Sequence, residues 1–466
     1  MTDRIWLKSY PKGVPADIDP GKYTSVVEMM EESFKKFAKR TAYSFMGKEQ
    51  TYGQVDSLSE AFGTYLQGLG LVKGDRVAVM MPNVLQYPIA VAGILRAGFT
   101  LVNVNPLYTA RELEHQLKDS GAKAIVILEN FAHTLEHVRA QVPIRHIVVT
   151  SLGEMLGLVK GAIVNFVVRK VRKLVPPWRL DGHVRFSTAL QRGAAHELQP
   201  AQVGHEDVAF LQYTGGTTGV AKGAMLTHRN VIANLQQAHA WIAPYVGEGK
   251  EIIITALPLY HIFSLTANCL TFLKIGAKNV LIPNPRDIPG FIKELGQHRF
   301  TAITGVNTLF NALLNNPEFA KLDFSTLRVS LGGGMAVQQV VAEKWKKVTG
   351  VSLVEAYGLT ETSPAVTINP LDLAGLIDPG RPEDAGASLA TLLTGGQMSL
   401  KDPFWDTTST AFMSGLITWL LADCPPEERR FSRLFELFTD NDLAYRLAVM
   451  LDTKAVHHPT AYAEVA

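Results

Sequence analysis

The residue types that could do chemistry concentrate in residues 213–228, which read Tyr-Thr-Gly-Gly-Thr-Thr-Gly-Val-Ala-Lys-Gly-Ala-Met-Leu-Thr-His. Glycines free the backbone to curl around an anion, and threonine hydroxyls donate hydrogen bonds to phosphate oxygens. The lysine adds a compact positive charge. This composition predicts a phosphate-binding loop made of Tyr213, Thr214, Gly215, Gly216, Thr217, Thr218, Gly219, Lys222 and Gly223.

The predicted loop does not follow the Walker pattern, which needs glycine directly before the lysine and serine or threonine directly after it. Here Ala221 precedes Lys222, and Gly223 follows it. The alternative interpretation is a surface turn that is rich in glycine and threonine and binds nothing. The apolar run at residues 208–213 predicts a strand that leads into the loop.

Two further segments place candidate site residues after predicted strands. Residues 330–336 contain Gly332, Gly333 and Gly334, and a run without side chains lets a flat ring approach the backbone closely. Glycines also make turns, so this run alone is weak evidence. Residues 354–363 present Ala356, Tyr357, Gly358, Thr360 and Glu361. A carboxylate beside a phosphate site is a natural ligand for Mg²⁺, so Glu361 is the candidate metal ligand.

A histidine at position 261 lies among aromatic residues in the segment 257–264, which reads Leu-Pro-Leu-Tyr-His-Ile-Phe-Ser. Taken alone, His261 is more simply explained as a histidine of the core. Its place among the other candidate segments makes it a candidate for binding a substrate.

Strands and helices alternate along most of the chain, which predicts an α/β fold with largely parallel sheets. A helix is expected over residues 26–37, because Val26, Met29, Met30, Phe34 and Phe37 share one face. The predicted strands are residues 76–81, 101–105, 124–128, 252–255, 277–282, 300–304, 327–331 and 352–355.

Composition restricts the class of protein. With 466 residues, 47% of them hydrophobic, the chain is expected to form two to four folding units. Its net charge of +2 gives no case for nucleic-acid binding. Two isolated cysteines and an N-terminus without an apolar signal core indicate a reducing, cytoplasmic location. Residues 77–95 and 252–273 lack charges, but prolines and polar residues interrupt them, so buried strands and core helices are expected there.

Residues 155–178 combine apolar side chains with Lys160, Arg169, Lys170, Arg172 and Lys173. A basic amphipathic helix of this kind is typical of peripheral contact with a membrane surface, here the inner membrane. A partly buried connector with solvated charges is the alternative.

The chain changes character near residue 369. Residues 369–466 hold 14 acidic and 7 basic residues, whereas the preceding 368 hold 29 acidic and 38 basic residues. Strand patterns stop there, and helices are expected over residues 407–421, 427–438 and 443–451. This shift predicts two domains, residues 1–368 and residues 369–466.

Taken together, the order and spacing of the segments at 213–223, 257–264, 330–336 and 354–363 resemble the AMP-forming adenylating enzymes. The resemblance is strongest to the bacterial long-chain fatty acid–CoA ligases and covers residues 5–368. It implies a large domain of stacked sheets and helices with an incomplete barrel. It also implies that a long-chain fatty acid is activated with ATP and Mg²⁺, and that the acyl group then passes to CoA.

Carried over to this chain, the resemblance implies a role for each candidate segment. Residues 214–222 would hold the β- and γ-phosphates of ATP, and residues 332–334 would border the adenine. Residues 356–358 would pack on the adenine through Tyr357. Thr360 would touch the α-phosphate, Glu361 would bind Mg²⁺, and His261 would line the channel near the acyl carboxylate. Lys222, Thr360 and Glu361 would be the catalytic residues.

Other features of the family have no counterpart in this sequence. The resemblance implies an aspartate in a Thr-Gly-Asp turn and a small C-terminal domain with a catalytic lysine. No Thr-Gly-Asp occurs, and Lys401 and Lys454 lie in unrelated sequence. Instead, residues 369–373, 402–408 and 415–418 resemble part of the helical domain of conjugative coupling proteins of type IV secretion systems. A tail partner is not specified by the sequence.

Three functions follow as alternatives. The first is an acyl-adenylating enzyme, impaired by loss of charge stabilisation from the missing lysine. The second is a module that binds ATP or fatty acid without turnover. The third is a non-functional fusion of two unrelated genes joined at Asn369-Pro370.

Overall fold

The computed structural model describes residues 4, 7, 10–214, 221–371, 413–420 and 422–425. The chain divides into two compact units. One is Asp17–Asn369, and the other combines Met1–Ala16 with Pro370–Ala466. All the predicted site residues belong to the larger unit. The domain boundary expected at residue 369 stays a prediction, because most residues beyond it lie outside the described part of the chain.

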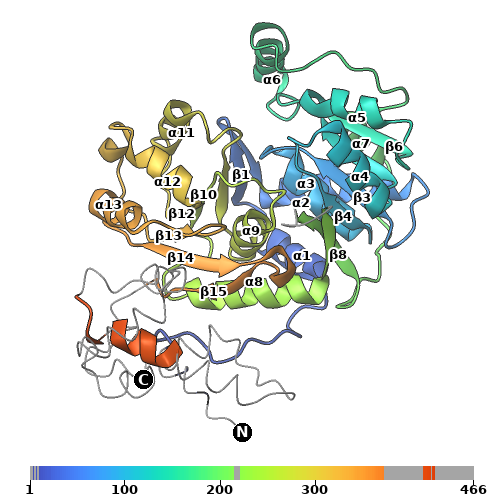
Figure 1. Cartoon of the computed structure of the whole chain (residues 1–466). Helices are drawn as coiled ribbons and strands as arrows, with labels where there is room; N and C mark the ends of the chain where they lie inside the picture. The colour runs from blue at the N-terminus through green and yellow to red at the C-terminus, as the bar shows by residue number, and fades with distance from the viewer. Residues whose placement is uncertain are drawn as a thin grey trace. The chain divides into compact units, whose positions relative to one another are not determined.

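The larger unit contains two mixed β-sheets with helices packed on them (Figure 1). The eight-stranded sheet has the order β15-β14-β13-β12-β10-β11-β1-β2. Its strands are β1 (Thr41–Phe45), β2 (Lys48–Thr51), β10 (Ile252–Thr255), β11 (Lys278–Leu281), β12 (Ala302–Gly305), β13 (Val329–Gly332), β14 (Leu353–Gly358) and β15 (Ala365–Ile368). Only β2 and β15, at the two edges, pair antiparallel with their neighbours.

The seven-stranded sheet has the order β7-β6-β5-β3-β4-β8-β9. Its strands are β3 (Arg76–Met80), β4 (Thr100–Asn103), β5 (Ala124–Leu128), β6 (His146–Thr150), β7 (Val184–Arg185), β8 (Val208–Thr214) and β9 (Lys222–Thr227). All neighbours are parallel except β8 and β9, which form an antiparallel pair at one edge. Two mixed sheets with helices confirm the predicted α/β fold.

Helices connect the strands as the alternating pattern predicts. They are α1 (Val26–Lys36), α2 (Tyr52–Gln67), α3 (Gln86–Arg96), α4 (Ala110–Ser120), α5 (Ala132–Val138), α6 (Leu158–Phe166), α7 (Phe186–Gly193), α8 (His228–Ile242), α9 (Ile262–Ser264), α10 (Phe272–Lys274), α11 (Ile288–Leu295), α12 (Asn307–Leu314) and α13 (Gln339–Thr349). The structure also has the 3-10 helices η2 (Glu129–Phe131), η5 (Phe319–Lys321) and η6 (Thr360–Thr362), and the π-helices η3 (Val167–Val171) and η4 (Leu265–Thr271).

Local sequence explains where several helices begin. The side chain of Ser25 caps α1 by accepting a hydrogen bond from the Glu28 amide. Thr51, Thr109 and Thr227 form capping boxes at the starts of α2, α4 and α8. The predicted apolar face of the first helix is confirmed, because its five members are all buried.

Both uncharged windows fold as strands followed by core helices, as predicted. In the first, β3 leads to α3, whose residues from Gln86 to Leu95 are all buried. In the second, β10 leads to α9, η4 and α10. No helix in the described part of the chain is long and apolar enough to cross a membrane. The β1–β2 hairpin was not predicted, because the polar sequence of β2, Lys-Glu-Gln-Thr, carries no apolar alternation.

In the smaller unit, residues 413–420 form a helix in which Leu416, Trp419 and Leu420 are buried. This agrees with the helix expected over 407–421 wherever the structure describes it. The helices expected over 427–438 and 443–451 lie outside the described residues.

Candidate functional site

The predicted phosphate loop joins two antiparallel strands. Thr214, at the end of β8, lies opposite Lys222, at the start of β9, and Tyr213 lies opposite Gly223. Lys222 is exposed. Residues Gly215, Gly216, Thr217, Thr218 and Gly219 lie outside the described part of the chain, so their phosphate contacts stay a prediction. The two strands nevertheless bring both ends of the loop to one edge of the sheet.

Helix α4 holds this hairpin at two points, one in β8 and one directly before β9. The hydroxyl of Tyr213 donates to Oδ2 of Asp119 at 2.6 Å. One turn earlier in the same helix, Nε2 of His115 donates to the carbonyl oxygen of Ala221 at 2.9 Å. Burial, followed by the Asp119 carboxylate, raises the pKa of Tyr213 well above its usual value, which keeps the phenol a donor. His115 and Asp119 were not among the predicted site residues, and their spacing of four residues on a helix was the available signal.

Gly223 is required by the packing of the same hairpin. A Cβ atom at this position would lie 2.9 Å from the ring of Tyr213. The glycine therefore lets the tyrosine ring lie flat against the facing strand while its hydroxyl reaches α4. Its role in this structure is to seat Tyr213.

The segment with Thr360 and Glu361 meets this hairpin. Both residues lie in η6, which contacts β8 and β9. Glu361 is exposed, and Thr360 is half-buried. Thr214 and Thr360 are far apart in the sequence, and the tertiary fold places their segments against each other. A carboxylate and a hydroxyl thus stand beside the predicted phosphate loop.

The glycine run ends β13 and packs against two other predicted segments. A Cβ on Gly333 would lie 3.0 Å from the Phe263 ring and 3.1 Å from the carbonyl oxygen of Ala356. Gly334 has a φ of +77°, a conformation that favours glycine. This run therefore contacts both the histidine segment and β14.

Strand β14 carries the remaining predicted nucleotide residues. The side chain of Tyr357 is 61% exposed, which leaves its ring free for a planar ligand. A Cβ on Gly358 would lie 2.0 Å from the carbonyl oxygen of Pro364, so only glycine fits at this position. Because β13 and β14 are parallel neighbours, their carboxyl ends, which carry these residues, lie side by side at the same end of the sheet.

His261 caps α9 rather than joining the core. Its Nδ1 accepts a hydrogen bond from the Phe263 amide at 3.3 Å, which places the proton of the neutral ring on Nε2. The surrounding protein partly desolvates the imidazole and so lowers its pKa, although the residue keeps an exposed face. A neutral ring with an Nε2–H donor can bind a carboxylate.

Asn83, one of the polar residues that interrupt the uncharged window 77–95, holds the histidine segment. Its amide donates to the carbonyl oxygens of Thr255 and Leu257, both at 2.9 Å, and accepts from the Leu259 amide at 2.8 Å. Tyr87, in α3, donates a hydrogen bond to the carbonyl oxygen of Leu259 at 2.7 Å. These bonds fix the loop that precedes His261.

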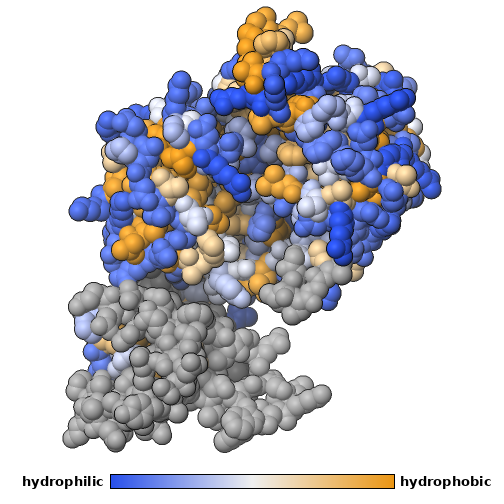
Figure 2. Space-filling model, turned by 45° about the horizontal axis from the view of Figure 1, so that its top comes forward, coloured by the Kyte–Doolittle hydropathy of each residue, from blue (hydrophilic) through white to orange (hydrophobic). Residues whose placement is uncertain are grey.

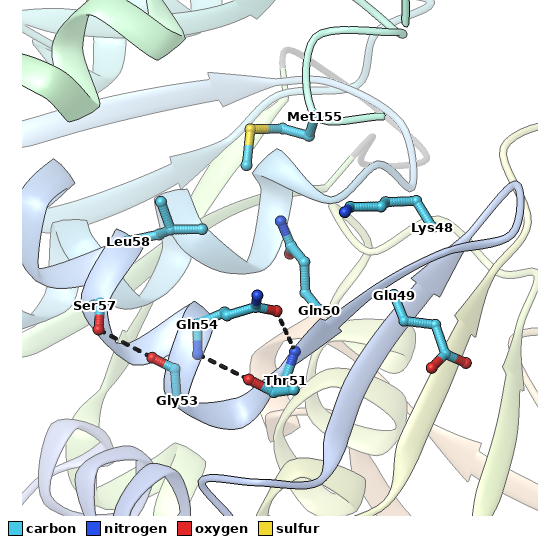
Figure 3. Close-up of a pocket in the computed structure, with 9 residues that line it drawn as sticks. All are labelled: Lys48, Glu49, Gln50, Thr51, Gly53, Gln54, Ser57, Leu58 and Met155. Atoms are coloured by element: carbon cyan, nitrogen blue, oxygen red, sulfur yellow. Dashed lines mark hydrogen bonds between the residues drawn. The ribbon is translucent and has the colours of Figure 1, made fainter. Parts of the chain in front are cut away.

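A separate pocket of about 500 Å³ contains none of the predicted residues. It lies at the start of α2 (Figure 3) and is lined by Lys48, Glu49, Gln50, Thr51, Gly53, Gln54, Ser57, Leu58 and Met155. Thr51 and Gln54 use their polar groups on each other in the capping box, as the dashed lines show (Figure 3). The side chain of Glu49 pairs with Lys278. These groups are engaged in structural bonds, and we assign no function to this pocket.

Among the described residues, no group of three histidine, cysteine or acidic side chains could hold a metal ion by itself. The assembled segments instead combine one lysine, one carboxylate, glycine-bordered backbone, an exposed tyrosine ring and a neutral histidine. This set can bind a nucleotide through its phosphates and base, and a carboxylic acid beside it.

The fold and this arrangement define a known class. Residues 30–403 match the family model described as AMP-binding enzyme, and the chain belongs to that family. A solved anthranilate CoA ligase in complex with anthranoyl-AMP has the same fold, with a TM-score of 0.65 at 22% identity over 76% of this chain and 64% of that one. A solved long-chain-fatty-acid-CoA ligase from Archaeoglobus fulgidus gives 0.63 at 23% identity over 78% and 70%.

Curated relatives show which members of this family the chain resembles in sequence. The chain is 59% identical over 372 residues to a long-chain-fatty-acid–CoA ligase of Yersinia pestis, covering 80% of this chain and 66% of the relative. A ligase of the same name from Escherichia coli O6:H1 is 58% identical over 371 residues, covering 79% and 66%. The chain thus spans about two thirds of the length of these relatives. This similarity supports the resemblance to long-chain fatty acid–CoA ligases over about four-fifths of the chain.

Proposed function

We propose that this chain activates a long-chain fatty acid with ATP to form an acyl-adenylate and pyrophosphate. In the complete reaction the acyl group then passes to CoA. The observation that supports the proposal is the contact of η6 with β8 and β9, which brings Thr360 and Glu361 next to the hairpin that carries the predicted phosphate loop (here called the phosphate hairpin). Identities of 58–59% to long-chain-fatty-acid–CoA ligases support the choice of substrate.

The chemistry of the step suits these residues. Attack of a carboxylate on the α-phosphorus brings two anions together, so catalysis rests on positioning and on neutralising negative charge. Lys222 and the loop residues 214–219 would hold the β- and γ-phosphates, and Thr360 would contact the α-phosphate. The Nε2–H of His261 would orient the fatty-acid carboxylate. Gly332, Gly333, Gly334 and the face of Tyr357 would enclose the adenine.

We propose Glu361 as the protein ligand of Mg²⁺. Its exposed carboxylate beside the phosphate hairpin fits a cation that takes one or two protein carboxylates and completes its shell with phosphate oxygens and water. Bound there, Mg²⁺ would neutralise charge on the pyrophosphate leaving group.

Exchange of labelled pyrophosphate into ATP tests the first half-reaction directly. We expect exchange that depends on added long-chain acid and falls about tenfold to a hundredfold in Lys222→Ala. Lys250→Ala, at another exposed lysine, is the matched control and should keep full exchange. Folded, ATP-binding protein with no exchange would overturn the proposed activity.

Transfer to CoA is the second half of the proposed reaction. Single-turnover assays that separate acyl-AMP from acyl-CoA measure its rate relative to adenylation. Acyl-AMP that accumulates without any acyl-CoA would limit the proposed activity to the first half-reaction.

We also propose that residues 369–466 derive from a conjugative coupling protein, joined to the ligase segment as a chimera. A peptide spanning residues 366–373 in cellular protein digests would support a translated junction. Resequencing the codons for residues 365–372 would detect an assembly error instead.

We place the protein in the cytoplasm with peripheral contact to the inner membrane through residues 155–178.

A further inference from the structure

We propose that α6 and η3 form a preformed docking surface for an anionic lipid bilayer. The surface consists of five apolar side chains, Leu158, Val159, Ile163, Phe166 and Val171, together with the basic side chains beside them; these apolar residues are called the docking face below. Its capacity to bind lipid stands on the geometry of this helix alone. Only its consequence for substrate supply rests on the proposed ligase activity.

The docking face is unusually apolar and exposed. Leu158 is 94% exposed, Val159 76%, Val171 62%, Phe166 61% and Ile163 58%. With Val167 and Leu174, seven of the fifteen large apolar side chains that are exposed on the described part of the chain lie between positions 158 and 174. Figure 2 shows them as an orange projection over α6, bordered by hydrophilic side chains. Single exposed apolar residues are ordinary, whereas a contiguous cluster indicates a binding surface.

The opposite side of the helix anchors it to the protein. A Cβ on Gly161 would lie 2.3 Å from the carbonyl oxygen of Gly153, so the helix backbone rests directly on the preceding loop. Asn165 accepts a hydrogen bond from the Gly153 amide at 2.8 Å and donates to Oγ of Ser151 at 3.0 Å. The helix therefore has a defined inner face that packs on this loop, and the residues of the docking face point away from it.

Further along the helix, an ion pair locks the same orientation. Arg169 donates to both carboxylate oxygens of Glu129, at 2.8 and 2.7 Å, and the Glu129 side chain is 3% exposed. Val168 is also buried, and Lys160 donates to the carbonyl oxygen of Met46. With these residues engaged, the helix cannot roll to bury Leu158 or Phe166 without breaking several bonds at once.

The basic side chains around the docking face favour an anionic bilayer as its partner. Residues 155–180 contain six basic residues and no acidic residue. Lys170, Arg172 and Lys173 are exposed, and within the described residues they have no acidic partner. An apolar face with lysine and arginine at its border matches the interface of an anionic bilayer, where acyl chains lie beneath phosphate headgroups. A second copy of the chain would bring like charges together, which argues against a dimer through this face.

For a ligase of long-chain acids, this surface has a direct consequence. Such acids partition into bilayers, so a docked enzyme would draw its acyl substrate from the membrane rather than from dilute solution. This consequence rests on the proposed function, whereas lipid binding itself does not.

Co-sedimentation with vesicles tests the docking surface on the full-length protein. We expect binding to vesicles of phosphatidylcholine with 30% phosphatidylglycerol, and about tenfold weaker binding to phosphatidylcholine alone. The double variant L158S/F166S should lose about tenfold in affinity for the anionic vesicles. V72S/L107S, which removes two apolar side chains of similar exposure elsewhere, should bind as the parent does.

Two matched measurements separate charge from apolar insertion. K170Q/K173Q should weaken binding to anionic vesicles about tenfold and reduce its salt dependence, whereas K346Q/K347Q, with the same loss of charge, should not. A tryptophan introduced as F166W should shift its emission to the blue with vesicles, and one introduced as V72W should not. These readouts do not use the ligase reaction, so a failed exchange assay leaves them interpretable.

Three results would overturn the proposal. The first is an absence of binding to anionic vesicles by the folded protein. The second is equal binding by the parent and L158S/F166S. The third is a dimer in sedimentation equilibrium that L158S/F166S converts to monomer without any lipid binding, which would assign the face to a second copy.

Discussion

At the scale of single residues, the site depends on contacts that leave no room for larger side chains. Gly358 is the clearest case, because the atom that would meet its Cβ, the carbonyl oxygen of Pro364, belongs to the backbone and cannot rotate away. Residues 358–364 enclose η6, so this contact also sets where Thr360 and Glu361 stand. Gly204, by comparison, has open space around it and no positive φ.

Gly358→Ala should therefore separate β14 from β15 and lower the free energy of unfolding by about 1–3 kcal/mol. It should also weaken ATP binding, because η6 moves with the turn. Chemical denaturation and titration with a fluorescent ATP analogue measure the two effects. Gly204→Ala is the control and should change neither. Unaltered ATP affinity in Gly358→Ala would show that η6 does not contribute to the nucleotide site.

His115 and Asp119 give a second prediction at this scale, as residues that position the phosphate loop without touching the nucleotide. His115→Ala removes the bond to the Ala221 carbonyl, worth about 0.5–1.5 kcal/mol, so KM for ATP in pyrophosphate exchange should rise about threefold to tenfold. kcat should change less, because the reacting groups remain. Arg111→Gln, at an exposed position of the same helix, should leave both constants unchanged. A fall in kcat with KM constant would contradict a positioning role.

At the scale of elements, α8 connects several parts of the larger unit through buried groups. Its first residue, His228, accepts a hydrogen bond from the Val26 amide at 3.1 Å and is 2% exposed. Near its other end, His239 accepts a hydrogen bond from Nζ of Lys274 at 2.9 Å. Burial lowers the pKa of each histidine to about 4. Both rings accept hydrogen bonds, so both must be neutral in the native fold.

These histidines predict acid instability. Because the native pKa of about 4 lies below the unfolded value of about 6.5, the unfolded state binds more protons between those pH values. The free energy of unfolding should therefore fall as the pH drops from 6.5 to 4, and His228 alone should account for up to about 3 kcal/mol of that loss. Below pH 4 its contribution should stay constant.

Denaturation with urea at pH 7, 5.5 and 4.5 measures the effect. His228→Gln keeps an acceptor for the Val26 amide but cannot titrate, so its stability should fall less over this range. His196→Gln, at an exposed histidine, should follow the parent. Parallel curves for the parent and His228→Gln would assign the acid sensitivity to other groups.

At the scale of the whole molecule, every described contact of the candidate site lies within residues 17–369. The last of these residues is held in place, because the Asn369 amide donates to the Glu355 carbonyl at 2.9 Å and Nε1 of Trp241 donates to the Asn369 carbonyl at 3.2 Å. The side-chain amide of Asn234 donates to the Ala365 carbonyl oxygen at 2.8 Å and accepts from the Ala365 amide at 3.0 Å. Strand β15 is thus fixed by bonds from the larger unit itself.

A chain that ends at residue 371 should consequently keep its ATP affinity within about twofold, since a compact unit with its own core can fold alone. Isothermal titration of both proteins with ATP, after matching their folded fractions by circular dichroism, makes the comparison. A shortened protein that folds but no longer binds ATP would show that residues 372–466 take part in the site.

Local patterns in the sequence determined much of this protein. The helix at 26–36 and strands such as 252–255 and 124–128 were predictable, because burial imposes a period on side chains that lie on one face. The candidate phosphate loop, the glycine run and the segment with Thr360 and Glu361 could be proposed from sequence, because each combines particular residue types within a few positions of one another.

The tertiary structure alone decided which distant residues meet. Nothing in the sequence around His115, Asp119 or Asn83 pairs them with the loops they hold, because those partners are backbone atoms or lie many residues away. Residues 155–178 were predicted as a basic amphipathic helix or a partly buried connector, and whether the apolar side chains would be covered depended on where the rest of the chain packed. Glycine contacts, Asn165 and the ion pair of Arg169 with the buried Glu129 hold one face of α6 and η3 against the protein, and so the apolar face is left to water or to a membrane.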